Sequence, residues 1–249
     1  MPNDCHHLPF VASSNGSRTD QKLEDTKAVE LFGGAILCRF PNAFIDVSTM
    51  RQIPDNQEVW LRSPTSLDCF IVELLQFQED AAENNPLEYF FQDLAAQNDC
   101  DCSRLMEGSV AIQDHCFLLS DNNNPFALKD YFPTMADGEQ KYSGSVSVHD
   151  TAQNRVTVSI GAGLQHVPSR KHHLLQVQEK DSSWIHIEML LIRFWGLQTD
   201  ILITYSKESD ALPEANIPSL LGGDKATDET TEFVNICKSL KIVDWKLFG

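Results

Sequence analysis

Apolar and polar side chains alternate along residues 184–194, and this period of two predicts a long β-strand. Gly196 marks a turn, and residues 199–205 repeat the alternation as the return strand of a hairpin. Residues 144–150 and 155–160 show the same period on either side of a polar turn. The pattern therefore predicts antiparallel sheet in the second half of the chain.

Two segments have the period of an amphipathic helix instead. In the first, Asn85 can cap the helix, Pro86 takes the first helical position and Glu88 follows three residues after the cap. Its apolar stripe consists of Leu87, Phe90, Phe91 and Leu94. The second segment is 228–240, with a stripe of Phe233, Ile236, Cys237 and Leu240. Each helix must cover its stripe, which predicts helices packed on the sheet.

The N-terminal part contains a stretch, residues 31–60, in which turn residues separate short apolar runs. Gly33 and Gly34 allow a tight, close-packed backbone, and a strand-like run follows them until Pro41 stops it. A polar turn at 54–56 then leads into another strand-like segment, 57–62. Residues 67–77 are ambiguous from the pattern alone, because their dense apolar positions fit either a helix face or a buried strand.

Length and composition indicate one globular domain. The chain has 249 residues, of which 42% are hydrophobic, and no internal repeat is visible. Residues 1–28 are polar and are predicted to be a disordered tail before a single domain at 29–249. No apolar run is long enough for a transmembrane helix, and the first residues lack the layout of a secretory signal. We therefore expect no membrane insertion.

The charge balance restricts the class of partner. The net charge is −17, which argues against a nucleic-acid surface and is compatible with a basic protein partner, or with solubility alone. The seven cysteines are odd in number and irregularly spaced, a pattern typical of a reducing compartment. We expect no metal site, because Cys5-His6-His7 and Asp99–Cys102 do not supply four ligands at a suitable spacing.

The sequence gives little support for a catalytic or nucleotide-binding site. His186 and Glu188 share a strand face, but no nucleophile accompanies them, so a packed or partly exposed sheet face is the better interpretation. Gly161-Ala162-Gly163 lacks the third glycine and the helix of a nucleotide-binding loop. The basic cluster at 170–173 is best explained as a solvated loop. The sequence thus offers no motif for an enzyme.

The stretch from residue 31 to residue 60 resembles the signature of the Ran guanine-nucleotide release factors, small Ran-binding proteins of nuclear import. Further matches follow along the chain, so the resemblance extends over about residues 29–249, and it favours a strand at 67–77. The matching segments are Leu31–Ala35, Ile45–Ser48, Pro54–Val59, Phe70–Gln76, Phe91–Asp93, Gln198–Leu202 and the closing residues 242–249.

This resemblance implies a fold and a function. The fold would be of the α/β (α+β) class: an antiparallel sheet of about six strands with helices on both faces, an α/β/α sandwich of the kind shared with the photosystem PsbP proteins. The function would be to bind the Ran GTPase, promote guanine nucleotide release and support nuclear protein import. A monomer that works in the nucleus and cytoplasm without cofactor or catalytic side chain is expected, with other Ran-binding proteins as candidate partners. The alternatives are a PsbP-like structural protein or an enzyme of unrecognised type.

The resemblance also suggests where Ran binds. In the family, the strand matched by residues 70–76 carries two acids implicated in the Ran contact. The first maps to Glu73 and the second to Gln76, so one charge is missing here. Glu73 lies among apolar residues in the sequence and should reach solvent or a partner, with an internal salt bridge as the alternative. The signature loop would add an acidic surface, unless its acids only cap turns; the predicted loop residues are Asp46, Asp55, Asn56 and Glu58.

Overall fold

The computed structural model describes most of the predicted domain. The predicted strand at 144–150 and the basic cluster at 170–173 lie outside the described residues, as do most of residues 1–28. The described residues are 25–63, 68–81, 85–106, 110–116, 126–131, 134–136, 139–141, 155–168, 182–209 and 232–249.

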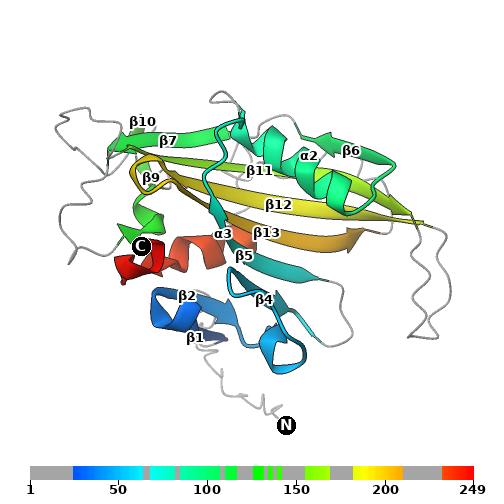
Figure 1. The fold of residues 1–249 in the computed structure, drawn as a ribbon, viewed down its shortest axis with the longest axis horizontal. Helices are drawn as coiled ribbons and strands as arrows, with labels where there is room; N and C mark the ends of the chain where they lie inside the picture. Colours follow the sequence, from blue (N-terminus) through cyan, green and yellow to red (C-terminus); the bar gives the residue numbers. More distant parts are fainter. Residues whose placement is uncertain are drawn as a thin grey trace, which may run out of the picture.

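The main sheet has eight strands, and every pairing in it is antiparallel. Its order is β3-β4-β5-β13-β12-β11-β6, with β7 also paired to β11 (Figure 1). The predicted hairpin is confirmed, since β12 pairs with β13 and Leu190 lies opposite Ile203. The strands are β3 (Ile45–Asp46), β4 (Gln57–Leu61), β5 (Cys69–Gln76), β6 (Cys102–Leu105), β7 (Val110–Cys116), β11 (Arg155–Pro168), β12 (Ser182–Phe194) and β13 (Thr199–Ser209).

A second sheet of four strands joins segments that are far apart in the sequence. Its order is β1-β2-β14-β8, so the beginning, middle and end of the domain meet in it. The strands are β1 (Thr26–Leu31), β2 (Ile36–Pro41), β8 (Phe126–Ala127) and β14 (Lys241–Ile242). Because β1 begins at Thr26, the last three residues of the predicted tail belong to this sheet. A separate two-stranded ribbon consists of β9 (Thr134–Ala136) and β10 (Glu139–Lys141).

Both predicted helices are present. The first, α2 (Pro86–Gln97), begins as expected, because the Asn85 side chain accepts a hydrogen bond from the Glu88 backbone N–H at 3.3 Å. The second is α3 (Glu232–Ser239). None of the helices in the described part of the chain combines the length and apolar character needed to cross a membrane. The short 3-10 turns are η1 (Phe32–Gly34), η2 (Val47–Thr49), η3 (Leu128–Tyr131), η5 (Trp195–Leu197) and η6 (Trp245–Phe248).

In the described part of the chain, each face of the main sheet carries one helix, as the α/β/α prediction requires. On one face, Phe91 of α2 packs with Met189 and Leu191 of β12. Gly163 of β11 lies directly beneath, and a Cβ built there would be 2.4 Å from the Phe91 ring. The other face is covered by α3 and the second sheet over a larger cluster, which includes Phe40, Phe44, Phe70, Tyr205 and Phe233. The sheet has eight strands, somewhat more than the six expected.

The cover on the α2 face is incomplete. The helix lies over β6, β11 and β12 (Figure 1) rather than over β4 and β5. Three side chains of β5 that point to this face, Ile71, Glu73 and Leu75, are therefore only half-buried. Polar groups on this part of the sheet can reach solvent or a partner.

Candidate functional site

Glu73 is positioned by the pairing of β5 with β4. Gln57 lies directly opposite, and its Nε2 donates a 2.6 Å hydrogen bond to Glu73 Oε1. Burial raises the pKa of the Glu73 carboxyl, the Gln57 hydrogen bond lowers it, and the negative charge of Asp93 on α2 raises it. Among the described residues, no Lys, Arg or His forms an ion pair with Glu73, so the internal salt bridge considered from the sequence is not formed there.

The turn before β4 lies beside the end of β5. Asn56 Nδ2 donates to the Leu74 carbonyl oxygen at 3.2 Å, and the Leu74 N–H donates to the Asn56 carbonyl oxygen at 2.9 Å. Asp55, Asn56 and Gln76 are exposed. These contacts place four of the six predicted residues around the turn before β4 and the second half of β5, together with two others, although Gln76 alternates with Glu73 along β5 and its side chain points to the opposite face. We call this set the Glu73 surface; it consists of Asp55, Asn56, Gln57, Glu73, Gln76 and Asp93.

The other two predicted residues have contacts within the fold. Asp46 caps η2, accepting hydrogen bonds from the Ser48 N–H and from Ser48 Oγ, both at 2.8 Å. This is the turn-capping role that the sequence left open. Glu58 Oε1 accepts a 2.6 Å hydrogen bond from the Phe32 N–H, and burial raises the pKa of its carboxyl. Because Glu58 lies opposite Val72, its side chain points to the face away from Glu73.

The Glu58 contact explains why the signature combines a glycine pair with a distant glutamate. Phe32 and Gly33 both have positive φ, 50° and 65°, so the turn after β1 is sharply folded. The Glu58 carboxylate satisfies the backbone N–H at this turn. The residue therefore stabilises the signature turn rather than extending the Glu73 surface.

The sequence did not single out Gln57 or Asp93 as site residues. Gln57 holds the Glu73 carboxylate, and Asp93 contributes its charge to the same place. Both lie inside segments matched to the family, 54–59 and 91–93, so the signal was present. Their proximity to Glu73 depends on strand register and helix packing, which the pattern could not supply.

The weak catalytic and metal candidates have structural explanations. Glu188 is buried and its Oε2 accepts a 2.8 Å hydrogen bond from Lys207 Nζ, while burial lowers the pKa of neighbouring His186. Gly163 lies within strand β11 rather than in a loop. Within the described residues, no three His, Cys, Asp or Glu side chains come together to hold a metal ion.

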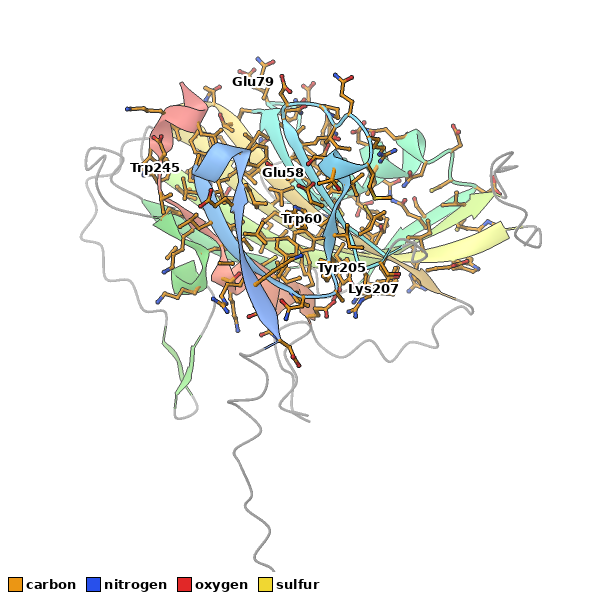
Figure 2. The ribbon with its side chains drawn as sticks, turned by 90° about the horizontal axis from the view of Figure 1, so that it is seen from below. Glu58, Trp60, Glu79, Tyr205, Lys207 and Trp245 are labelled. Carbon is orange, nitrogen blue, oxygen red and sulfur yellow. The ribbon has the colours of Figure 1, made fainter. Side chains whose placement is uncertain are left out.

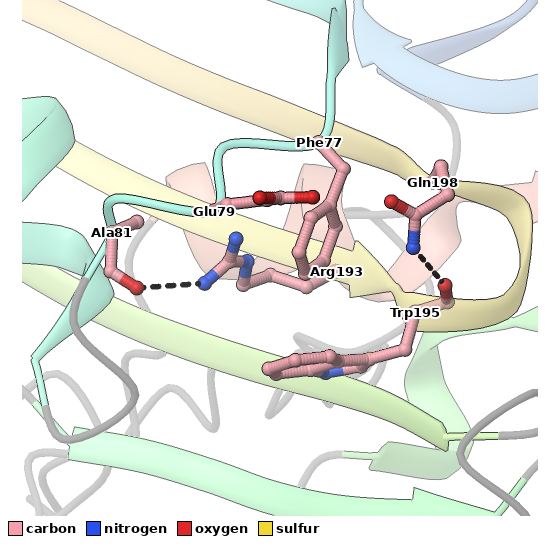
Figure 3. Close-up of a pocket in the computed structure, with 6 residues that line it drawn as sticks. All are labelled: Phe77, Glu79, Ala81, Arg193, Trp195 and Gln198. Atoms are coloured by element: carbon pink, nitrogen blue, oxygen red, sulfur yellow. Dashed lines mark hydrogen bonds between the residues drawn. The ribbon is translucent and has the colours of Figure 1, made fainter.

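A cavity of about 300 Å³ beyond the end of β5 is built around Arg193 (Figure 3). The Arg193 guanidinium pairs with Asp200 at 3.0 Å, donates to the carbonyl oxygens of Gln78 and Ala81, and lies 4.2 Å from the Phe77 ring centroid. Its donors are directed at groups of the protein itself. The arrangement fixes the connection between β5 and α2 to the sheet rather than offering a free cation to a ligand.

Comparison with known proteins agrees with this fold. The family model described as "Ran-interacting Mog1 protein" matches residues 29–208. The Ran guanine nucleotide release factor of Danio rerio is 44% identical over 220 residues, covering 88% of this chain and 98% of the relative. The nuclear import protein mog1 of Schizosaccharomyces pombe is 44% identical over 71 residues, covering 28% of this chain and 37% of the relative.

Solved structures show the same fold. The crystal structure of the Saccharomyces cerevisiae Ran-binding protein Mog1p aligns with a TM-score of 0.51 at 19% identity, covering 90% of this chain and 98% of that one. The structure of a point mutant of the protein Mog1 aligns with the same TM-score at 20% identity, covering 90% and 99%. The fold and these matches thus define a member of a family of Ran-interacting proteins. The chain belongs to the Mog1 family.

Proposed function

We propose that this chain binds the GTPase Ran, promotes release of its guanine nucleotide and supports nuclear protein import. The observation that carries the proposal is the 44% identity to a Ran guanine nucleotide release factor over 98% of that relative. The names of the fungal relatives as nuclear import proteins support the third part. We assign the activity to a single domain, residues 29–249, acting as a monomer in the nucleus and cytoplasm.

We propose further that Ran contacts the Glu73 surface. Glu73 is half-buried on the same face of β5 as Ile71 and Leu75, and its hydrogen-bond partner within the described residues is a neutral amide. A carboxylate in this setting gains most from a cation that arrives with a partner. Asp55 and Asp93 add negative charge nearby. A basic patch on Ran is therefore the occupant that the charges favour.

The proposed mechanism needs no catalytic side chain and no cofactor. A protein releases a bound nucleotide when it binds the nucleotide-free or distorted GTPase more tightly than the loaded form. By linkage, it then lowers the nucleotide affinity by the same factor. A surface complementary to one state of Ran is sufficient, and the polar groups of the Glu73 surface can supply it.

The test is to measure both sides of this linkage. The dissociation of a fluorescent guanine nucleotide from Ran should accelerate as the full chain is added. The affinity of the chain for Ran should fall when nucleotide is added, by the factor by which the chain lowers nucleotide affinity. Binding without faster dissociation would contradict the release activity. Absence of binding would contradict the whole proposal.

Salt dependence gives a second test of the site. Association steered by opposite charges should slow as ionic strength rises, because the screening length falls to about 8 Å at physiological salt. We expect a marked drop in the on-rate for Ran between low and high salt. An on-rate that does not change would mean that the charge of −17 serves solubility alone.

A further inference from the structure

The second sheet has one buried face and one exposed face. Residues that point inward from it, such as Leu31, Ile36 and Ile242, are fully buried against the core. The alternating residues point outward and are exposed. Figure 2 looks onto this side of the molecule, with β1 and β2 in front. The exposed outward residues are Ala28, Glu30, Leu37, Arg39, Lys241 and Val243; we call this set the Leu37 face.

Two large apolar side chains lie together on this face. Leu37 is 38% exposed and Val243 is 41% exposed, and they are two of the four large hydrophobic residues found exposed in the described part of the chain. Leu37 lies opposite Lys241 in the pairing of β2 with β14. Val243 follows two residues later, and its N–H donates to the Ala35 carbonyl oxygen at 2.9 Å. A contiguous apolar spot is thus surrounded by polar groups.

Two cations lie beside this apolar spot. Arg39 follows Leu37 on β2, and Lys241 lies beside it on β14. Two further exposed lysines follow β8 and β14 along the chain. Lys129 comes two residues after Ala127, which pairs with Lys241. Lys246 follows Trp245, whose ring centroid lies 6.3 Å from that of Phe126 on β8.

Most of this positive charge is not neutralised inside the protein. In the described residues, Lys129, Lys241 and Lys246 form no ion pair, whereas Arg39 bonds to Thr26. Two carboxylates lie on or beside the face: Glu30 is opposite Leu37, and Asp244 accepts the Lys246 N–H at 3.0 Å. Two cations thus lie on this face and two more in the segments that follow β8 and β14, in a chain with a net charge of −17.

We infer that the Leu37 face is a second protein-binding surface, and that it takes an acidic segment of a partner whose apolar side chains rest on Leu37 and Val243. Charge complementarity determines the class of occupant, because cations that form no ion pair within the described residues attract carboxylates. The apolar spot adds affinity through buried area and selects segments that mix acids with apolar residues. Nucleic acid is a weaker fit, since the rest of the chain would repel its phosphates.

This face and the Glu73 surface lie on different sheets. The inference does not depend on Ran binding, and the two surfaces can be occupied at the same time. Glu73 points to the α2 face of the main sheet, whereas the second sheet covers the opposite face. A partner on the Leu37 face should therefore leave the affinity for Ran unchanged.

The test titrates the full chain, labelled for NMR, with a synthetic peptide of alternating glutamate and leucine. We expect the amide signals of β2 and β14 to shift. Reversing two charges, with R39E and K241E together, should weaken binding roughly ten-fold, and L37S with V243S should weaken it to a similar extent. The matched control R51E with R104E reverses two exposed arginines elsewhere and should change affinity less than about two-fold.

Several results would overturn the inference. One is binding that R39E with K241E leaves unchanged; another is shifts confined to α2 or β5. A lysine–leucine peptide or an oligonucleotide that binds the same amides as well as the acidic peptide would show that charge does not select the partner. Failure of the full chain to bind the acidic peptide would also overturn it. Dilution would then show whether a second copy or another part of the chain covers the face.

Discussion

The two faces of β5 differ in how completely the fold covers them. Phe70 and Val72 point to the α3 side and are buried in the large aromatic cluster. Ile71 and Glu73, from the same strand, point to the α2 side and stay half-buried. One face is closed by a helix and a second sheet, while the other is closed only where α2 lies. Glu73, the central residue of the proposed binding surface, therefore lies where the cover of the sheet ends, on a strand rather than on a loop.

Two carboxylates, Glu58 on β4 and Glu73 on β5, also point to opposite faces of the sheet and differ in their hydrogen-bond partners. Glu58 and Glu73 are both partly buried, and burial raises the pKa of each. Glu58 bonds to the Phe32 backbone N–H and so stabilises a turn. Glu73 bonds to the Gln57 amide and keeps the capacity to bind a partner. Glu58 thus stabilises the fold, and Glu73 is the acid that we propose meets the partner.

The largest expected effect lies at the connection that fixes α2 to the sheet. Arg193→Met leaves the Asp200 carboxylate, which is fully buried, without its ion-pair partner. Breaking a buried pair on one side costs about 3–5 kcal/mol of unfolding free energy. Urea unfolding should show this loss, whereas Arg104→Met at an exposed position should stay within about 0.5 kcal/mol. Equal stability of the two variants would contradict the structural role given to Arg193.

A smaller loss is expected where α2 touches β11. Gly163→Ala places a Cβ 2.4 Å from the Phe91 ring and 3.0 Å from the Arg104 carbonyl oxygen, so the helix must shift. Overpacking of this kind costs about 1–3 kcal/mol. Thermal or urea unfolding measures the loss, and adding Phe91→Leu should restore part of it. If the double variant were no more stable than Gly163→Ala alone, Phe91 would not be the cause.

Local sequence patterns predict single elements of this fold, but not long-range contacts such as that between Gly163 and Phe91. The period of β12 and the capping of α2 are local, so both were predicted correctly. The sequence rejected Gly161-Ala162-Gly163 as a nucleotide-binding loop, but the pattern cannot show that a glycine inside a strand makes room for Phe91. The second sheet brings residues 26–31 together with residues 241–242, and local patterns carry no information on such pairings.

The candidate site was predicted in part for the same reason. The family resemblance pointed to Glu73 and Gln76, and the structure places both on one strand beside Asn56. Asp46 and Glu58 were grouped with them because they are polar and occur in the same stretch of sequence. Their contacts with Ser48 and with Phe32 depend on tertiary geometry and could not be predicted from residue type.

Restoring the missing acid should strengthen Ran binding modestly. Gln76→Glu adds a carboxylate at the exposed end of β5, where an ion pair with Ran contributes roughly 0–1 kcal/mol, or up to about five-fold in affinity. The gain should disappear at high salt. Titration of Ran at two ionic strengths measures both effects. Weaker binding by Gln76→Glu at low salt would show that this end of β5 does not face a cation.

The smallest expected effect is a slight gain in stability on replacing Glu73, accompanied by weaker Ran binding. Its pKa is raised in the fold, so the folded state holds the proton more tightly than the unfolded state, and ionisation as the pH rises lowers stability. Glu73→Gln removes this cost and still accepts the Gln57 hydrogen bond. Urea unfolding at neutral pH should show a gain of roughly 0.5 kcal/mol or less, which vanishes in acid. The same variant should bind Ran more weakly; a loss of stability at neutral pH would contradict this account.

The most direct test of the account compares Ran binding by Glu73→Lys and Glu30→Lys. Both variants change the net charge of −17 equally, but Glu30 lies on the second sheet, away from the Glu73 surface. We predict that Glu73→Lys abolishes Ran binding through like-charge repulsion while circular dichroism shows an intact fold, and that Glu30→Lys binds as the parent does. If Glu73→Lys binds Ran as tightly as Glu30→Lys, the Glu73 surface is not the Ran site.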